Sequence, residues 1–267
     1  MNWIGGELTA TPAHLRRLSD VNHEETEPTY RFVVQAVRPL LRLICRHDWR
    51  NQDRVPAEGA VIFVANHISY LDPIVLAEYL IMSGRWPRYL GKSEIFRVPI
   101  LGTIGRACGQ IPVERGSERA ADSLIHATEA LKAGRAICMY PEGTLTRDPD
   151  GWPMTGRTGA ARLALATGVP VVPVGQWGAQ EIVPGPGLRW PRFSWRRRTV
   201  SFTCGEPIDL SDLQGQEPSK TEMVEASNRM MDAITDLVAT LRDEPAPLDR
   251  YDSREGRRVP IRQLEEG

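Results

Sequence analysis

Short apolar runs alternate with stretches of helical periodicity along the middle of the chain. Residues 60–65 are continuously apolar, and residues 136–140 form a second such run. Runs of this length are typical of strands buried on both faces of a sheet. Two stretches with apolar residues at helical spacing lie between these runs, at residues 71–82 and 117–134. The alternation predicts an α/β domain with a mostly parallel sheet flanked by helices, over residues 57–242.

Further elements extend the same pattern toward the C-terminus. Residues 110–113 and 199–203 read as strands, and residues 169–174 as another strand whose two prolines favour an edge or irregular position. A final long helix is predicted to begin at a capping box, in which Ser219 and Glu222 have the required spacing.

The two ends of the chain differ from this central region. Residues 1–28 are polar and mixed, which predicts a flexible leader, and residues 243–267 combine prolines with charges, which predicts a flexible tail. Residues 29–56 are interpreted as an amphipathic basic helix that associates with a membrane.

The membrane interpretation depends on charge as well as periodicity. Residues 30–50 carry five arginines against one aspartate among regularly spaced apolar side chains. Such a segment can lie in a bilayer interface with its arginines toward anionic headgroups, or pack on the domain with its arginines in water. No stretch reaches the roughly 18 apolar residues that a spanning helix requires. We therefore expect a peripheral, monotopic protein on an anionic membrane surface.

Composition limits the kinds of partner and the cellular compartment that the chain suits. The 267 residues carry a net charge of −1, so the chain as a whole gives no reason to expect a nucleic-acid partner. Residues 188–198 interleave aromatics with arginines, which suits single-stranded nucleic acid, a lipid interface, the phosphates of coenzyme A, or an ordinary exposed loop. The four cysteines are widely spaced, which favours reduced thiols and a cytosolic compartment.

Candidate chemistry begins directly after the first buried run. His67 follows residues 60–65, and Asp72 comes five positions later at a predicted helix start. An aspartate that holds one ring nitrogen leaves the other free to take a proton from a hydroxyl. The alternative is a helix-capping Asp72 beside a structural His67.

Two further strand ends carry polar residues. Glu114 and Arg115 follow residues 110–113, while Glu142, Gly143 and Thr144 follow the run at 136–140. The carboxyl ends of parallel strands meet at one edge of a sheet, so these groups are expected near His67. The histidines are too scattered for a metal site, and no Gly-x-Ser-x-Gly elbow supplies a serine nucleophile.

Taken together, these motifs resemble the glycerophospholipid acyltransferase family, which includes the 1-acylglycerol-3-phosphate O-acyltransferases (lysophosphatidic acid acyltransferases). The first family block is matched by Asn66, His67, Ser69 and Asp72. The later matches are Lys92 to Pro99, Gly109 to Arg115, Pro141 to Thr144 and Val169 to Val174. The resemblance covers residues 57–210.

The resemblance implies roles for individual residues. His67 would act as the general base, oriented by Asp72, and Arg115, Glu142 and Gly143 would belong to the acceptor site. In many members an arginine follows the third block, whereas here Leu145 follows Thr144. Its phosphate contact could pass to Arg147, Arg157 or Lys92, and Arg147 could equally be a solvated loop charge. The remaining block residues expected at the substrate are Asn66, Ser69 and Thr144.

The expected reaction is transfer of an acyl group from acyl-coenzyme A or acyl carrier protein to the free hydroxyl of lysophosphatidic acid, which makes phosphatidic acid for phospholipid biosynthesis. Acyl-coenzyme A is then a co-substrate, and no bound cofactor is expected. The alternatives are another acceptor, such as glycerol 3-phosphate or a glycolipid, a thioesterase-type hydrolase, or a lipid-binding protein without activity. The expected location is the cytoplasmic face of the cell membrane.

Overall fold

The computed structural model describes residues 13–113, 120–185, 196–214 and 218–261. Its strands are β1 (Cys45–Arg50), β2 (Val61–Ala65), β3 (Pro87–Lys92), β4 (Ile111–Val113), β5 (Ala136–Met139), β6 (Val171–Trp177), β7 (Arg198–Cys204), β8 (Asp249–Asp252) and β9 (Arg257–Pro260). Its α-helices are α1 (Leu18–Val21), α2 (Pro28–Ile44), α3 (Asp72–Met82), α4 (Ser93–Arg97), α5 (Pro99–Ala107), α6 (Ala120–Lys132), α7 (Gly159–Thr167) and α8 (Lys220–Arg242).

Seven strands form the central sheet, in the order β1-β7-β6-β2-β5-β3-β4. Every neighbouring pair is parallel except β6 and β7, which are antiparallel. The mostly parallel α/β fold predicted from the sequence is therefore confirmed. Because β2, β5, β6, β3 and β4 run the same way, their carboxyl ends meet at one edge of the sheet, where ligands bind in such folds.

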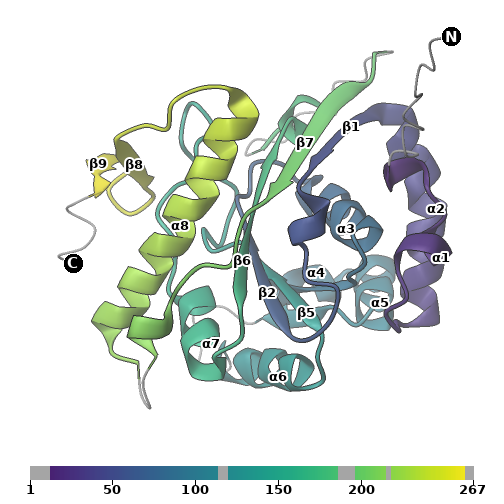
Figure 1. Cartoon of the computed structure of the whole chain (residues 1–267), viewed down its shortest axis with the longest axis horizontal. Coiled ribbons are helices and arrows are strands. Elements are labelled where there is room, and N and C mark those ends of the chain that lie inside the picture. The colour runs from purple at the N-terminus through teal and green to yellow at the C-terminus, as the bar shows by residue number, and fades with distance from the viewer. Residues whose placement is uncertain (1–12, 114–119, 186–195, 215–217, 262–267) are drawn as a thin grey trace, which may run out of the picture.

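Helices cover both faces of the sheet, with α6, α7 and α8 on one side and α1 to α5 on the other (Figure 1). Strand β2 shows why the sheet is buried so completely. Its Ile62 and Val64 pack into the cluster formed with α7 and α8, whereas Val61 and Phe63 pack into the cluster formed with α3. All of these side chains are fully buried, as expected for a continuous apolar run in the centre of a sheet.

The ends of the predicted helices follow local signals. Helix α8 begins at Ser219, whose Oγ accepts the N–H of Glu222 at 3.2 Å while the Glu222 carboxylate accepts the N–H of Ser219 at 2.6 Å. The capping box predicted from the sequence is thus confirmed. Helix α7 ends at Gly168, which has a left-handed φ of 65° that a residue with a side chain adopts less easily.

The prediction of an edge position for the proline-containing strand was wrong. Strand β6 lies inside the sheet, between β7 and β2. Pro173 is tolerated there because the antiparallel pairing with β7 starts one residue later, at Val174. The carbonyl of Pro173 still accepts the N–H of Gly205 at 2.9 Å. The proline therefore deprives the sheet only of the hydrogen bond that a backbone N–H at this position would donate.

The predicted boundaries at the N-terminal side also need correction. Residues 13–28, expected to be part of a flexible leader, pack against α3: Leu18 is buried, and the Asn22 amide donates to the carbonyl of Ile81 at 2.8 Å. The helix expected over residues 29–56 ends at Ile44, where the chain enters β1 and pairs with β7. The central sheet therefore starts before residue 57. Residues 1–12 lie outside the described part of the chain.

One arginine of helix α2, Arg38, is buried, although the arginines of this segment were expected to face headgroups or water. The buried face of α2 carries Tyr30, Val34, Arg38 and Leu41, because these positions recur at helical spacing against the domain. Arg38 therefore lies inside the protein rather than toward solvent. The large exposed apolar side chains of α2 lie on another face, at Phe32, Leu40 and Leu43.

The expected C-terminal tail forms the antiparallel hairpin β8–β9 beside α8 (Figure 1). The buried side chain of Arg250 contacts Asp232 of α8 with Nη2 to Oδ1 at 2.5 Å. Prolines and charges thus gave a misleading signal, since Arg250 and Arg258 of this segment form ion pairs with the domain. Residues 262–267 are not among those described.

Among the helices of the described ranges, none combines the length and apolar composition needed to cross a bilayer. The four cysteines are all free and buried, as the sequence predicted.

Candidate active site

His67 and Asp72 lie at the carboxyl end of β2, where the chain turns into α3. Nδ1 of His67 is 2.9 Å from Oδ2 of Asp72. The same carboxylate oxygen accepts the backbone N–H groups of Ile68 at 2.6 Å and Ser69 at 2.7 Å. Asp72 thus closes the turn and fixes the ring at the same time.

The surroundings of the two side chains differ. Asp72 is fully buried, and burial raises the pKa of its carboxyl, an effect opposed by its hydrogen bonds with His67 and the two backbone N–H groups. The side chain of His67 is 18% exposed and lines a cavity. With Nδ1 facing Asp72, Nε2 is the nitrogen left to exchange a proton with a ligand.

Residues after β5 hold His67 from the other side. The ring stacks on Tyr140 with centroids 4.1 Å apart and planes at 14°. The backbone N–H of His67 donates to Oε1 of Glu142 at 2.8 Å, and its carbonyl accepts the N–H of Thr146 at 2.7 Å. Both backbone groups of the histidine are therefore fixed by one loop, which limits the movement of its ring.

Glu142 is part of this support. Its second oxygen accepts the N–H of Met154 at 3.1 Å, and the side chain is 1% exposed. Burial raises the pKa of Glu142 to about 8, although the hydrogen bonds from Met154 and His67 favour its ionised form. The next residue, Gly143, has a φ of +72°, and a Cβ there would meet Cδ of Arg157 at 2.9 Å. The positive φ favours glycine at this turn, and the side chain of Arg157 lies close to it.

The cavity beside His67 has a volume of about 590 Å³. The carboxyl ends of the neighbouring strands β2, β3 and β5 contribute His67, Lys92, Tyr140, Gly143 and Thr144 to its lining, and this part of the wall is called the polar end. The remaining wall is mostly apolar and comes from α2, α3, α4 and α5: Val33, Val37, Leu41, Ile74, Ala77, Ile95, Leu101 and Ile104. A pocket with a few polar groups at one end and hydrocarbon along the rest suits an amphiphilic ligand.

A buried charged group interrupts the apolar wall. Glu78 of α3 lines the cavity and is 2% exposed. Its Oε2 is 3.0 Å from Nε2 of His47, and its Oε1 is 3.7 Å from Nε of Arg38. No sequence pattern indicates this cluster, because its members come from three elements that only the fold brings together.

The structure separates the residues predicted at the substrate into two groups. His67, Lys92, Gly143 and Thr144 line the cavity, whereas six others do not: Asn66, Ser69, Asp72, Glu142, Arg147 and Arg157. Arg147 and Arg157 are exposed, and Arg157 lies beside Gly143. Arg115 lies outside the described residues, as does most of the basic stretch predicted at 188–198.

Asn66 and Ser69 have partners within the protein. The amide of Asn66 donates to the carbonyl of Gln176 at 3.0 Å and accepts the Gln176 N–H at 3.0 Å, which ties the end of β2 to β6. The hydroxyl of Ser69 donates to the carbonyl of Val183 at 2.6 Å and accepts the N–H of Leu71 at 3.0 Å. Instead of facing a substrate, both side chains hold the turn that carries His67.

Sequence reasoning missed Tyr140 and Thr146, which contact His67 directly. Tyr140 ends a predicted strand next to the third block, so its position was a signal that could have been used.

Across the described ranges, no three His, Cys, Asp or Glu side chains gather into a possible metal site. Arg46, Arg196 and Arg197 line a second hollow of about 530 Å³.

Comparison with known proteins adds independent findings. Residues 46–177 match the family model described as Acyltransferase. The chain is 33% identical over 139 residues to the chloroplastic 1-acyl-sn-glycerol-3-phosphate acyltransferase BAT2 of Brassica napus, an alignment that covers 51% of this chain and 39% of that protein. It is 32% identical over 124 residues to a 1-acyl-sn-glycerol-3-phosphate acyltransferase of Borreliella burgdorferi, over 46% of this chain and 47% of that protein. The chain thus spans less than half the length of these relatives.

A solved structure shares the fold. The crystal structure of the 1-acyl-sn-glycerophosphate acyltransferase PlsC from Thermotoga maritima superposes with a TM-score of 0.59, at 22% identity, over 82% of this chain and 83% of that one. The identity is low, so this likeness supports the fold alone.

Proposed function

Because the chain belongs, through its domain at residues 46–177, to the acyltransferase family, we propose that it transfers a fatty acyl group from a thioester to the free hydroxyl of lysophosphatidic acid. One observation carries the proposal: the His67–Asp72 pair opens onto the polar end of a cavity whose other walls are mostly hydrocarbon. The relatives named above are 1-acyl-sn-glycerol-3-phosphate acyltransferases, which supports this acceptor.

The chemistry needs one base. Nε2 of His67 takes the proton of the acceptor hydroxyl as its oxygen attacks the thioester carbonyl. The tetrahedral intermediate then collapses, the carbon–sulfur bond breaks, and the imidazolium returns the proton to the departing thiolate. Asp72 stabilises the imidazolium through Nδ1 at 2.9 Å. No covalent intermediate with the protein is required, because the thioester is already activated.

The apolar part of the cavity would hold the acyl chain, while cationic side chains at the polar end bind the acceptor phosphate. Lys92 lines the cavity, and Arg157 lies beside Gly143 at its edge. A guanidinium suits phosphate because its planar donors match two oxygens at once. The donor is acyl-coenzyme A or acyl carrier protein, both of which present the same thioester.

The proposed place of action is the cytoplasmic surface of a membrane. Helix α2 exposes Phe32, Leu40 and Leu43 on one face, which can enter a lipid interface. The free, buried cysteines are compatible with a reducing compartment.

A thiol-release assay tests the proposed reaction. Palmitoyl-coenzyme A is supplied with and without lysophosphatidic acid, and the lipid product is identified by mass spectrometry against glycerol 3-phosphate and a lysoglycolipid as other acceptors. We expect thiol release only with an acceptor, and phosphatidic acid as the main product. Release at the same rate without any acceptor would identify a thioesterase, and a different preferred acceptor would overturn the proposed substrate.

A further inference from the structure

We propose that Arg258, on the C-terminal hairpin β8–β9, is a positioning residue for His67 and acts through the loop formed by residues 146–152. The hairpin lies outside the stretch that matches the family model, residues 46–177. The inference rests on the proposed function, since it concerns how the general base of that reaction is held.

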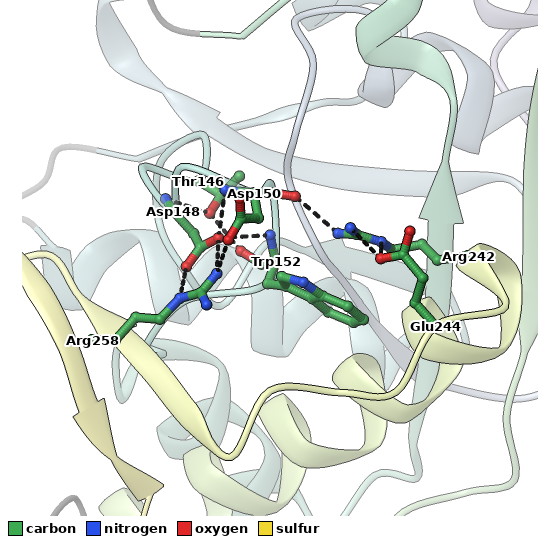
Figure 2. Close-up of polar contacts among 7 residues, drawn as sticks. All are labelled: Thr146, Asp148, Asp150, Trp152, Arg242, Glu244 and Arg258. Atoms are coloured by element: carbon green, nitrogen blue, oxygen red, sulfur yellow. Dashed lines mark hydrogen bonds and ion pairs between the residues drawn. The ribbon is translucent and has the colours of Figure 1, made fainter.

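Arg258 binds the loop through one edge of its guanidinium group, formed by Nε and Nη2 (Figure 2). Its Nε donates to Oδ2 of Asp148 at 2.6 Å, and its Nη2 donates to Oδ1 of the same residue at 2.7 Å. Nη2 also reaches Oδ2 of Asp150 at 2.8 Å. The side chain of Asp148 is 1% exposed, so this two-pronged pair is shielded from water on the aspartate side.

Asp148 in turn organises the loop. Its Oδ1 accepts the backbone N–H groups of Asp150 at 2.9 Å and Trp152 at 3.2 Å. The hydroxyl of Thr146 accepts the N–H of Asp148 at 3.2 Å and donates to the carbonyl of Trp152 at 2.7 Å. The loop is therefore closed around the carboxylate that Arg258 binds.

This closed loop is joined to the candidate active site by a backbone hydrogen bond. The N–H of Thr146 donates to the carbonyl of His67 at 2.7 Å. The path from Arg258 to His67 thus runs through Asp148 and Thr146, each step a direct hydrogen bond.

A second arginine supports the same loop from the end of α8 (Figure 2). The guanidinium of Arg242 lies 4.0 Å from the ring centre of Trp152 and donates to the carbonyl of Asp150 at 2.9 Å. Its other nitrogens bind Glu244 at 2.6 and 3.0 Å, which orients the group.

The hairpin is itself fixed, so it can serve as a support for Arg258. Arg250 of β8 contacts Asp232 of α8, and the carbonyl of Tyr251 accepts the N–H of Thr155 at 2.9 Å. Arg258 is therefore presented by a hairpin with its own attachments to the domain.

Loss of the Arg258 contact is expected to affect turnover more than folding. The chain just before the loop provides Gly143 and Thr144 to the cavity wall, and Glu142 holds the N–H of His67. A shift of the loop would change the position of the His67 ring relative to the acceptor hydroxyl. Misplacement by about 1 Å can reduce a rate by about 10².

The experiment compares two neighbouring arginines of β9 in the full chain. Arg258→Met removes the ion pairs with Asp148 and Asp150. Arg257→Met changes an exposed residue whose partner is Glu255 of the same hairpin, at 3.5 Å. Both are assayed with palmitoyl-coenzyme A and lysophosphatidic acid, well below the unfolding temperature of each variant. We expect Arg258→Met to lower kcat by at least about tenfold, and Arg257→Met to stay within about twofold of the wild type.

A double-mutant cycle with Asp148→Asn distinguishes positioning from general destabilisation. If the two residues act as one unit, the double variant loses little more kcat than Arg258→Met alone. Arg258→Lys keeps the charge without the fork and should restore part of kcat, a useful measurement if the Met variant does not fold. Normal kcat in folded Arg258→Met or Asp148→Asn, or additive losses in the cycle, would overturn the inference. A wild-type protein that transfers no acyl group would instead refute the proposed function.

Discussion

The carboxylate of Glu142 accepts the backbone N–H of His67 at 2.8 Å, across 75 residues of sequence. Its other oxygen accepts the N–H of Met154, so one buried side chain joins His67 to the chain beyond the loop. Glu142 therefore supports the position of the histidine, and its ionisation should be visible in the stability of the whole domain.

Stability should fall as the pH rises through the range in which Glu142 is protonated only in the folded protein. Burial raises the pKa of this carboxyl from 4.5 to about 8. Between these values the unfolded chain has lost a proton that the folded protein keeps, so ionisation favours unfolding. We expect the free energy of unfolding to decrease by up to about 1.4 kcal/mol per pH unit over that range, and to level off above it.

Chemical denaturation at a series of pH values measures this effect. Glu142→Gln cannot ionise and should flatten the slope, although its amide can accept only one of the two N–H groups. Glu58→Gln, at an exposed position, serves as the matched control and should keep the wild-type slope. Equal slopes in all three proteins would show that Glu142 ionises normally.

Replacing His67 should remove the general base without disturbing the fold. His67→Gln keeps a polar side chain of similar size on the Tyr140 ring, and kcat should fall by about 10² to 10⁴. Circular dichroism and thermal unfolding should match the wild type. A folded variant with more than a tenth of the normal kcat would exclude His67 as the base.

Asp72→Asn should be nearly as damaging, because it removes the negative charge that stabilises a protonated ring. Oδ2 of Asp72 makes all three contacts, with the N–H groups of Ile68 and Ser69 and with Nδ1 of His67. An asparagine oxygen in the same place keeps these contacts, but a neutral amide stabilises the imidazolium less than a carboxylate does. We expect kcat to fall by about 10² or more, whereas Asp53→Asn, at an exposed site, should have no effect. An active Asp72→Asn enzyme would show that the negative charge is not needed for the reaction.

The position of Arg157 predicts a phosphate contact that Arg147 does not share. Arg157 lies over Gly143 at the edge of the cavity, and a charge-assisted contact contributes about 1.5–3 kcal/mol. Arg157→Ala should therefore raise the KM for lysophosphatidic acid by about tenfold or more, with kcat little changed. Arg147→Ala should leave this KM unchanged. The two variants should not differ with monoacylglycerol, which lacks the phosphate, and a difference there would point to a role in binding the glycerol or acyl part.

The sequence predicted the parts of this protein that depend on local pattern. Continuous apolar runs predicted β2 and β5. The spacing of His67 and Asp72 predicted that the two side chains meet, and Nδ1 lies 2.9 Å from Oδ2. Both features are set within a few residues. The meeting of the strand ends was predicted, but the individual partners of side chains across distant segments could not be. Asn66 was expected at the substrate, yet it binds Gln176, a partner 110 residues away that only the pairing of β2 with β6 provides.

Contacts with distant segments also explain the wrong predictions near the two ends of the chain. Strand β1 is short and polar, and it becomes a strand because β7 offers a free edge beside it. The C-terminal hairpin was mistaken for a tail because its stability comes from Arg250 and Arg258, whose partners lie in α8 and in the loop after β5. Composition alone cannot show that a charged residue has a distant partner.

Membrane attachment should depend on the apolar exposed face of α2 rather than on its arginines. Arg38 is buried against Glu78, whereas Phe32 and Leu40 are 70% and 62% exposed. Full burial of such side chains is worth about 1.5–3 kcal/mol each, so the double variant Phe32→Glu/Leu40→Glu should weaken sedimentation with phosphatidylglycerol-containing vesicles by about tenfold or more. Leu248→Glu is the matched control, because Leu248 is 90% exposed but follows α8 instead of lying on α2. Equal binding by the double variant and the control would place the lipid-contacting surface elsewhere on the molecule. A loss seen equally with Leu248→Glu would mean that any added negative charge weakens binding.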